Sequence, residues 1–340
     1  MPHCLHMILA MIVLLVSAPS AHAQRTAKDL SANTGAIEHS ARWVDAAPLR
    51  ATLPARIGTL LGPNDVLSYA APGVLFPARN IGLQCQSVNA TLADVPHRAA
   101  TVRTIDGAVE PRFGEVDVDG ARVFRLQANA QDVLPSGTSP RCELVSYPMP
   151  GSALPQAETF WFAFSFWADD WSGTHDEQSI AQMHIQESRN ILLNPFFALV
   201  VRGSEMRVEL RLNEREVPNQ ATTRVVSTTR FPMPVRQWVT AVVQSRVSTE
   251  TKHAPFFRMW LNGKQVVDYT GPFGYVLPPG GYAYPKVGIY HWIAGNPWDL
   301  QVPTRALLVG AMITVHDSTD RYNQDLLQVV VARPEARQVR

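Results

Sequence analysis

Three short segments of the sequence carry residues that could move protons or bind an acid group. They are Arg141–Leu144 (RCEL), Gln182–His184 (QMH) and Tyr284–Tyr290 (YPKVGIY). Each fits a β-strand, in which residues two apart point to the same face. On that basis one face carries the side chains of Arg141, Glu143, Gln182, His184, Tyr284, Lys286 and Tyr290. Gly288 leaves a gap in this row, and we expect the gap to admit a ligand.

This set of side chains suits the cleavage of an acidic sugar chain by β-elimination. That reaction must neutralise the carboxylate of a uronate, remove the proton from C5 and protonate the leaving oxygen O4. Arginine and glutamine can hold the carboxylate and stabilise the developing enolate, and histidine and tyrosine can transfer the protons. A cation close to a tyrosine lowers the pKa of its hydroxyl, and we expect Lys286 to do so for Tyr290. Each residue alone is more often structural, and only their combination favours a reactive site.

The elements that must position these residues are β-strands. The clearest is residues 158–167 (ETFWFAFSFW), in which four phenylalanines alternate with Trp161, Ala163, Ser165 and Trp167. Such alternation is typical of a strand. Further strands are predicted at residues 121–127, 196–201, 206–212, 238–247, 256–261, 264–269 and 306–315, with Asn262-Gly263 as a tight hairpin turn. Because several strands carry large residues on both faces, we predict two stacked sheets, a β-sandwich of jelly-roll type.

The composition agrees with an all-β fold class. The 340 residues are 46% hydrophobic and 17% charged, as in a globular protein. The 26 prolines and 20 glycines suit many short strands joined by turns. A formal net charge of +1 provides no basic field that could hold a nucleic acid, so we exclude that class of partner.

The first 23 residues predict a signal peptide. Met7–Val16 is one apolar run, too short to span a bilayer, and Ala21-His22-Ala23 offers a cleavage site. We therefore expect a secreted or periplasmic protein that has no membrane contact after cleavage. A retained membrane anchor is the alternative.

Two cysteines would remain after this cleavage, because Cys4 would leave with the signal. Cys85 and Cys142 are either a disulfide, which suits an exported chain, or two buried thiols. Residues 24–95 are assigned as an N-terminal extension of uncertain structure, and residues 96–330 as the main domain. The pattern from 51 to 95 leaves open whether this part is a small cap or the start of the main domain.

Together, the three segments resemble the R-x-E-L, Q-x-H and K-x-G-x-Y motifs of the jelly-roll polysaccharide lyases, which include alginate lyases, glucuronan lyases and enzymes of the heparin lyase I type. The sequences FWFAFSFWADDW and MWLNGKQV are similar as well, and the resemblance covers roughly residues 100 to 320. It is strongest to the heparin lyase I and glucuronan lyase branch. It implies a concanavalin A-like jelly roll with a concave substrate groove. It also implies an anionic polysaccharide as substrate. We expect a monomer that needs no cofactor for its chemistry.

The resemblance further implies roles for individual residues. Arg141 and Gln182 match carboxylate-binding positions, and His184 matches the neutraliser or base. Tyr290 matches the acid, and in some members the base as well, while Lys286 matches a substrate-binding or tyrosine-tuning residue. Further candidates for substrate binding are Glu143, which looks like the partner that orients Arg141, Tyr284, and Trp292, which either stacks on a sugar or belongs to the core.

Two departures from the alginate lyases put alginate specificity in doubt. Val145-Ser146 stand where those enzymes usually carry a second arginine, and His291-Trp292 replace a polar Asn-Gln pair. The sequence does not choose among glucuronan, alginate and heparin-like chains.

Other charged residues have less distinctive patterns. An acidic loop, Asp169-Asp170 followed by residues 175–177 (HDE), either binds calcium or is solvated. Glu115 and Asp117 begin the spacing of two-carboxylate glycosidases, but Gly120 stands where the last acid belongs, so we reject a hydrolase. Four arginines either form a basic rim or pair with neighbouring glutamates, and the even charge balance favours pairing: Arg202, Arg207, Arg211 and Arg215.

Two other functions stay open. A lectin-like β-sandwich could bind acidic glycans without cleaving them, and a structural protein could share only the fold. His184 and Tyr290 argue against the lectin, because binding alone does not require groups that transfer protons.

Overall fold

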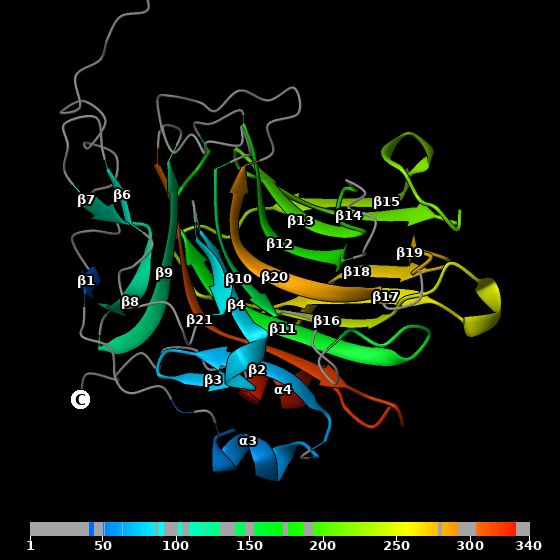
Figure 1. Ribbon diagram of the computed structural model, residues 1–340, viewed down its shortest axis with the longest axis horizontal. Helices are drawn as coiled ribbons and strands as arrows, with labels where there is room; N and C mark the ends of the chain where they lie inside the picture. Colours follow the sequence, from blue (N-terminus) through cyan, green and yellow to red (C-terminus); the bar gives the residue numbers. More distant parts are fainter. Residues whose placement is uncertain are drawn as a thin grey trace, which may run out of the picture.

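Two β-sheets stacked on each other make up most of the protein (Figure 1). The computed structural model describes residues 41–43, 50, 52–62, 64–85, 88–91, 101–103, 109–118, 120–129, 140–146, 153–172, 176–186, 193–277, 281–291 and 304–330. The expected signal peptide lies outside these residues. Within them, no helix is long and apolar enough to cross a membrane. The prediction of an all-β sandwich of jelly-roll type is confirmed.

One sheet, here called sheet A, has ten strands. Its main path runs β1 (Ala41–Trp43), β8 (Phe113–Val118), β9 (Ala121–Asn129), β21 (Thr304–His316), β11 (Thr159–Ala168), β16 (Val239–Arg246), β17 (Phe256–Leu261) and β18 (Lys264–Thr270). Off this path, β2 (Val66–Ala71) pairs with β21, and β3 (Val74–Phe76) pairs with β2.

The other sheet, sheet B, has nine strands. Its main path runs β15 (Arg224–Pro232), β14 (Glu205–Asn213), β13 (Phe197–Arg202), β12 (Glu177–Gln186), β20 (Tyr282–His291), β10 (Arg141–Ser146), β4 (Ile81–Cys85) and β5 (Val88–Thr91). The short β19 (Gly274–Tyr275) pairs with β14. The three sequence segments that could do chemistry are therefore the adjacent strands β12, β20 and β10.

The remaining elements are short. A separate ribbon pairs β6 (Thr101–Arg103) with β7 (Val109–Pro111). The helices are α3 (Ala55–Leu60) and α4 (Gln324–Val330), and the 3₁₀ turns are η1 (Ala78–Asn80), η3 (Gln220–Thr222) and η4 (Thr251–His253). In the predicted hairpin between β17 and β18, Asn262 and Gly263 both have positive φ, as this turn requires.

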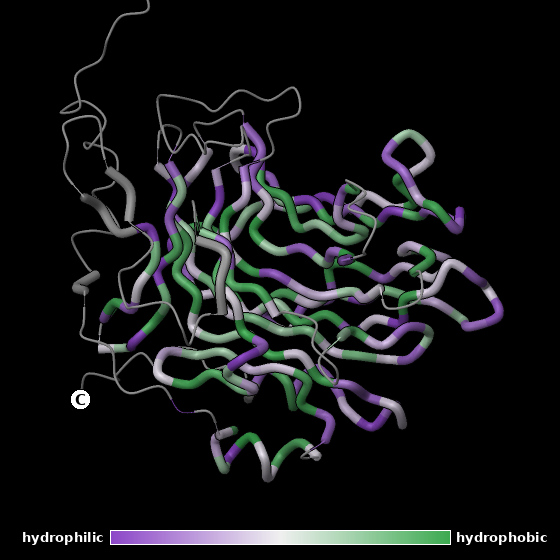
Figure 2. The backbone as a smooth tube through the Cα atoms, in the orientation of Figure 1, coloured by the Kyte–Doolittle hydropathy of each residue, from purple (hydrophilic) through white to green (hydrophobic). Residues whose placement is uncertain are grey.

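The hydrophobic core lies between the two sheets. Phe160, Phe162, Phe164 and Phe166 of β11 all point into it and are fully buried, as the alternating sequence predicts. Hydrophobic stretches run along the strands of both sheets (Figure 2). Sheet B contributes the residues that alternate with the candidate site residues, such as Met183. The candidate side chains therefore point to the outer face of sheet B.

The outer face of sheet A is covered by the two ends of the described chain. Trp161 of β11 packs there with Ile57 of α3, Tyr69 of β2 and Leu327 of α4. The β2 strand joins sheet A through β21, and β4 joins sheet B through β10. Described strands of residues 51–95 therefore pair with strands of both sheets.

Candidate functional site

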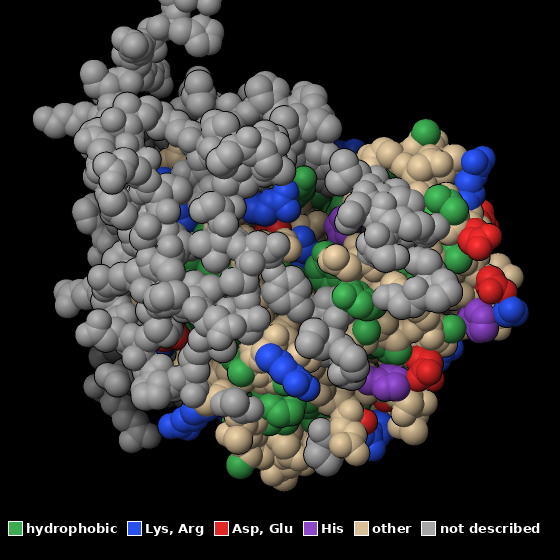
Figure 3. Space-filling model, in the orientation of Figure 1, with side chains coloured by type: hydrophobic (Ala, Val, Ile, Leu, Met, Phe, Trp, Pro, Cys, Tyr) green, Lys and Arg blue, Asp and Glu red, His purple; other side chains and the backbone are tan. Residues whose placement is uncertain are grey.

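The candidate site residues form rows across three neighbouring strands of sheet B. In the register, Arg141 lies opposite Tyr290, and Glu143 lies opposite Gly288. One step further along β20, Lys286 lies opposite Gln182, and Tyr284 lies opposite His184. Paired residues point to the same side of a sheet, so the predicted convergence on one face holds. Figure 3 shows basic, acidic and histidine side chains close together near the middle of this side of the molecule.

The floor of the site is a buried network of one anion, one cation and one amide. Glu143, Lys286 and Gln182 are each no more than 4% exposed. The Gln182 amide donates to Oε1 of Glu143, and the ammonium of Lys286 lies 3.7 Å from Oε2 of the same carboxylate. Burial lowers the pKa of Lys286, and the charge of Glu143 opposes that shift. A buried ion pair of this kind is costly to break from one side, so the network fixes the three strands relative to one another.

Arg141, and not Lys286, is the cation that lies against Tyr290. The guanidinium carbon of Arg141 stands 4.5 Å from the centre of the Tyr290 ring, whereas the Lys286 ammonium stands 5.6 Å from the centre of the Tyr284 ring. Lys286 and Tyr290 are four positions apart on the same strand, a distance of about 13 Å in an extended chain. Arg141 is the direct neighbour of Tyr290 across the sheet and therefore lies closer to its ring. The prediction that Lys286 lies beside Tyr290 is wrong on this point.

His184 is partly buried and surrounded by carbonyl oxygens and cations. Its Nδ1 lies 2.7 Å from the Ile185 carbonyl oxygen, and its Nε2 lies 3.0 Å from that of Leu193. Burial lowers the pKa of His184 to about 4, and the charges of Lys286 and Arg141 add to this effect. The ring is therefore neutral near pH 7 and has a single N–H, so it donates to only one of the two carbonyls.

Gly288 allows close contact between two strands and does not admit a ligand. A Cβ atom at this position would lie 2.2 Å from the carbonyl oxygen of Cys142 and 2.5 Å from the Cα of Glu143. The space beside Gly288 is thus filled by the backbone of β10, contrary to our expectation of a gap. The glycine lets the strand that carries Arg141 approach β20 closely.

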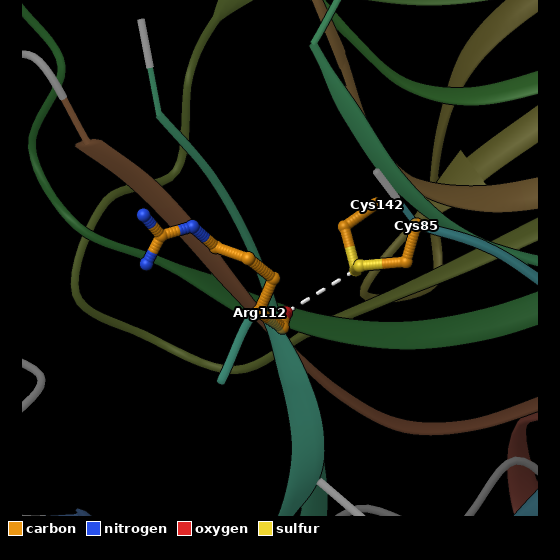
Figure 4. The surroundings of a disulfide bond; sticks show 3 residues. All are labelled: Cys85, Arg112 and Cys142. Atoms are coloured by element: carbon orange, nitrogen blue, oxygen red, sulfur yellow. Dashed lines mark hydrogen bonds between the residues drawn. A yellow bond between two sulfur atoms is a disulfide. The ribbon is translucent and has the colours of Figure 1, made fainter. Parts of the chain in front are cut away.

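A disulfide ties the strand β4 to the site strand β10. Cys85 and Cys142 lie directly opposite each other in the register and are bonded, as one of the two sequence alternatives predicted. The bond lies on the core side, where the sulfur of Cys142 is 3.2 Å from the carbonyl oxygen of Arg112 (Figure 4). Because Cys142 stands between Arg141 and Glu143 in the chain, the disulfide fixes the strand that carries both.

Gln84 is a site residue that the sequence did not reveal. It neighbours Cys85 in β4, lies opposite Glu143 in the register and accepts a hydrogen bond of 2.7 Å from the Lys286 ammonium. The pairing of the two cysteines was the only signal that could have found it, because that pairing fixes which residue of β4 faces Glu143.

Three acidic residues of this loop, Asp169, Asp176 and Glu177, are paired with arginines. Asp176 accepts a hydrogen bond of 2.8 Å from Arg305, and both are fully buried. Arg207 donates two hydrogen bonds to Glu177, and these lower the pKa of that carboxyl. No group of three or more metal-binding side chains occurs among the described residues. The calcium site stays a prediction.

Two other groups of candidates can be placed. Pairing with the neighbouring glutamates is confirmed for Arg207 and Arg211, which both contact Glu209, whereas Arg202 contacts Glu177. His291 is buried beside Gln178, at 2.9 Å. Trp292 lies outside the described residues.

Comparisons with known proteins concern the family and the fold. The family model described as "Polysaccharide lyase" matches residues 112–308, which is more than half of the chain. No curated protein matches the sequence. Among solved structures, an endo-β-1,4-glucuronan lyase from the fungus Trichoderma reesei is 12% identical, with a TM-score of 0.50 over 70% of this chain and 94% of that one. The alginate lyase A1-II′, described as a member of polysaccharide lyase family 7, is 14% identical, with a TM-score of 0.49 over 72% of this chain and 97% of that one. The likeness to the glucuronan lyase shows the fold. The match over residues 112–308 shows that this chain belongs to the polysaccharide lyase family.

Proposed function

We propose that this protein is an exported lyase that cleaves a uronate-containing anionic polysaccharide by β-elimination. The observation that carries the proposal is a set of side chains on one face of sheet B: Arg141, Gln182, His184, Lys286 and Tyr290. Export is supported by the apolar run Met7–Val16 and the small residues that follow it. A glucuronan, an alginate or a heparin-like chain would each supply the required uronate. The monomeric state and the lack of a cofactor requirement stay predictions.

The first task of the site is to neutralise the uronate carboxylate, because its negative charge opposes the formation of a carbanion at C5. Arg141 carries the charge for this, and its side chain is only partly buried. Gln182 gives one amide proton to Glu143. Its amide has a second proton, which it can offer to the carboxylate of the uronate. Such fixed donors stabilise the enolate as its charge develops.

The second task is to move two protons. A base accepts the proton from C5, the electron pair of that C–H bond forms the C4–C5 double bond, and the C4–O4 bond breaks as O4 is protonated. Tyr290 is the acid in this scheme. His184 is the neutraliser or the base, and its pKa of about 4 means that it is neutral at pH 7 and has a lone pair. The reaction is balanced without water or a redox partner.

The charges around the site favour a polyanion. Lys286 is paired with the buried carboxylate of Glu143, and Arg141 is a second cation on the same face of sheet B.

The test is to incubate the purified mature protein with glucuronan, alginate and heparin, each with and without calcium. The ultraviolet absorbance of the unsaturated uronyl end, which only elimination creates, should rise on at least one polymer. Tyr290→Phe and His184→Ala should abolish the rise with unchanged folding. Tyr269→Phe is the matched control, because Tyr269 lies on β18 of the other sheet. Its hydroxyl donates there to the carbonyl oxygen of Pro272.

The main alternative is a lectin-like protein that binds acidic glycans without cleaving them. Binding without any rise in absorbance would favour it, and full activity in both site variants would refute the assignment of the site.

A further inference from the structure

The ammonium of Lys286 is buried, and its closest described partner comes from the N-terminal part of the chain. Lys286 donates to Oε1 of Gln84 at 2.7 Å, whereas Oε2 of Glu143 is 3.7 Å away. That second distance is too long for a hydrogen bond. In keeping with this, Oε2 of Glu143 is buried without a hydrogen-bond partner in the described part of the chain. The amide oxygen of Gln84 therefore determines where the ammonium lies between the two strands.

The position of Gln84 is itself fixed by two contacts of β4. The strand pairs with β10 from Ile81 to Cys85, so that Gln84 stands opposite Glu143. The disulfide joins the next residue, Cys85, to Cys142. Gln84 lies outside residues 112–308, the range that matches the family.

We propose that Gln84 is a positioning residue of the active site, which acts by holding the Lys286 ammonium against β4. This rests on the proposed lyase function. The consequence is that the N-terminal segment completes the site: Gln84 accepts the hydrogen bond of the Lys286 ammonium, while Oε1 of Glu143 accepts that of the Gln182 amide. Without Gln84, the buried ammonium would lose its closest acceptor, and its charged form would be less favoured.

The groups that face Lys286 come from all four surrounding strands. Glu143 and Arg141 are on β10, His184 is on β12, Tyr284 is on its own strand β20, and Gln84 is on β4. A new charge at position 84 would therefore reach both Lys286 and His184.

Three variants separate positioning from a structural effect. Gln84→Leu keeps the bulk and removes the acceptor, and we expect kcat/KM to fall about 10- to 100-fold, as for the loss of a hydrogen bond to a charged group. Gln84→Glu keeps the acceptor, so we expect activity within about tenfold of the original protein, with the acidic limb of the pH–rate profile moved to higher pH because the added negative charge favours protonated His184. Gln265→Leu, at an exposed position of β18, is the matched control.

A second measurement does not depend on activity. Titration of Lys286 by NMR of isotope-labelled protein should give a lower pKa in Gln84→Leu and a higher one in Gln84→Glu. An unchanged Lys286 titration in both variants overturns the proposal, as does Gln84→Leu with activity within twofold of the original protein. A loss of activity that only follows a drop in Tm, without rescue by Gln84→Glu, also overturns it. If the original protein cleaves no polyuronate, the lyase function fails while the titration still decides the role of Gln84.

Discussion

Replacing Gly288 by alanine tests how closely the site strands must approach each other. The added Cβ would meet the Cys142 carbonyl oxygen at 2.2 Å and the Glu143 Cα at 2.5 Å. Carbon atoms pack at about 3.5 to 4.0 Å, so β10 and β20 would have to separate by about 1 Å. Both obstacles are backbone atoms, which cannot rotate away as a side chain could.

The expected cost follows from this separation. Overpacking typically destabilises by about 1 to 3 kcal/mol, and the backbone contact places Gly288→Ala near the upper end. In a domain of this size each kcal/mol lowers Tm by about 2 to 4 °C, so we expect a drop of about 6 to 12 °C. A misplacement of 1 Å in reactive groups can cost about 100-fold in rate, because Arg141 on β10 would move relative to Tyr290 on β20.

The assay pairs thermal unfolding with the rate of uronyl product formation. Gly58→Ala is the control, because a Cβ there meets nothing within 4 Å and the residue lies in helix α3, where alanine is favoured over glycine. An unchanged Tm and an unchanged rate in Gly288→Ala would refute the close approach of β10 to β20.

Three other predictions concern the buried groups. The pKa of His184 falls from 6.5 to about 4 on folding. Between these pH values the unfolded chain binds more protons, so the free energy of unfolding should decrease as the pH drops through this window. His184→Gln should flatten this pH dependence, and an equal slope of unfolding free energy against pH in the variant and the original protein would contradict the prediction. Replacing both Cys85 and Cys142 by serine opens a loop with a sequence separation of 57. Urea denaturation should then show a loss of about 4 kcal/mol, and a loss below about 1 kcal/mol would not fit a constraint on the unfolded chain. Arg305→Met leaves Asp176 buried without its cation and should cost about 3 to 5 kcal/mol in the same assay, whereas a neutral result would mean that the pair is not buried.

The strands and the shared face could be predicted from the sequence because both depend on local alternation. In β11, Phe162 and Trp161 point to opposite sides because successive residues of a strand do so, and both sides are apolar because both are covered. By the same rule, Gln182 and His184 of β12 share one face of their strand, and Lys286 and Tyr290 of β20 share one face of theirs.

What the sequence could not provide is register, which depends on how distant strands pair. The neighbour of Tyr290 is Arg141 because β10 and β20 are paired in one particular alignment. Gln84 is opposite Glu143 for the same reason. The role of Gly288 depends on the backbone of another strand, and no pattern within residues 284–290 records that distance.

The order of the strands has a consequence for how the protein acquires activity. β20 and β21 come late in the chain, yet β20 lies between β12 and β10, and β21 lies between β9 and β11. The pairing of Arg141 with Tyr290 joins residues 149 positions apart (290 minus 141). Such high contact order makes folding slow, because long loops must close before the contacts that stabilise them form. A growing chain that has reached residue 281 contains Arg141, Gln182 and His184. It still lacks β20 and β21, the strands that lie in the interior of the two sheets. Activity should therefore appear only with the completed fold, which makes product formation a direct reporter of the last folding step.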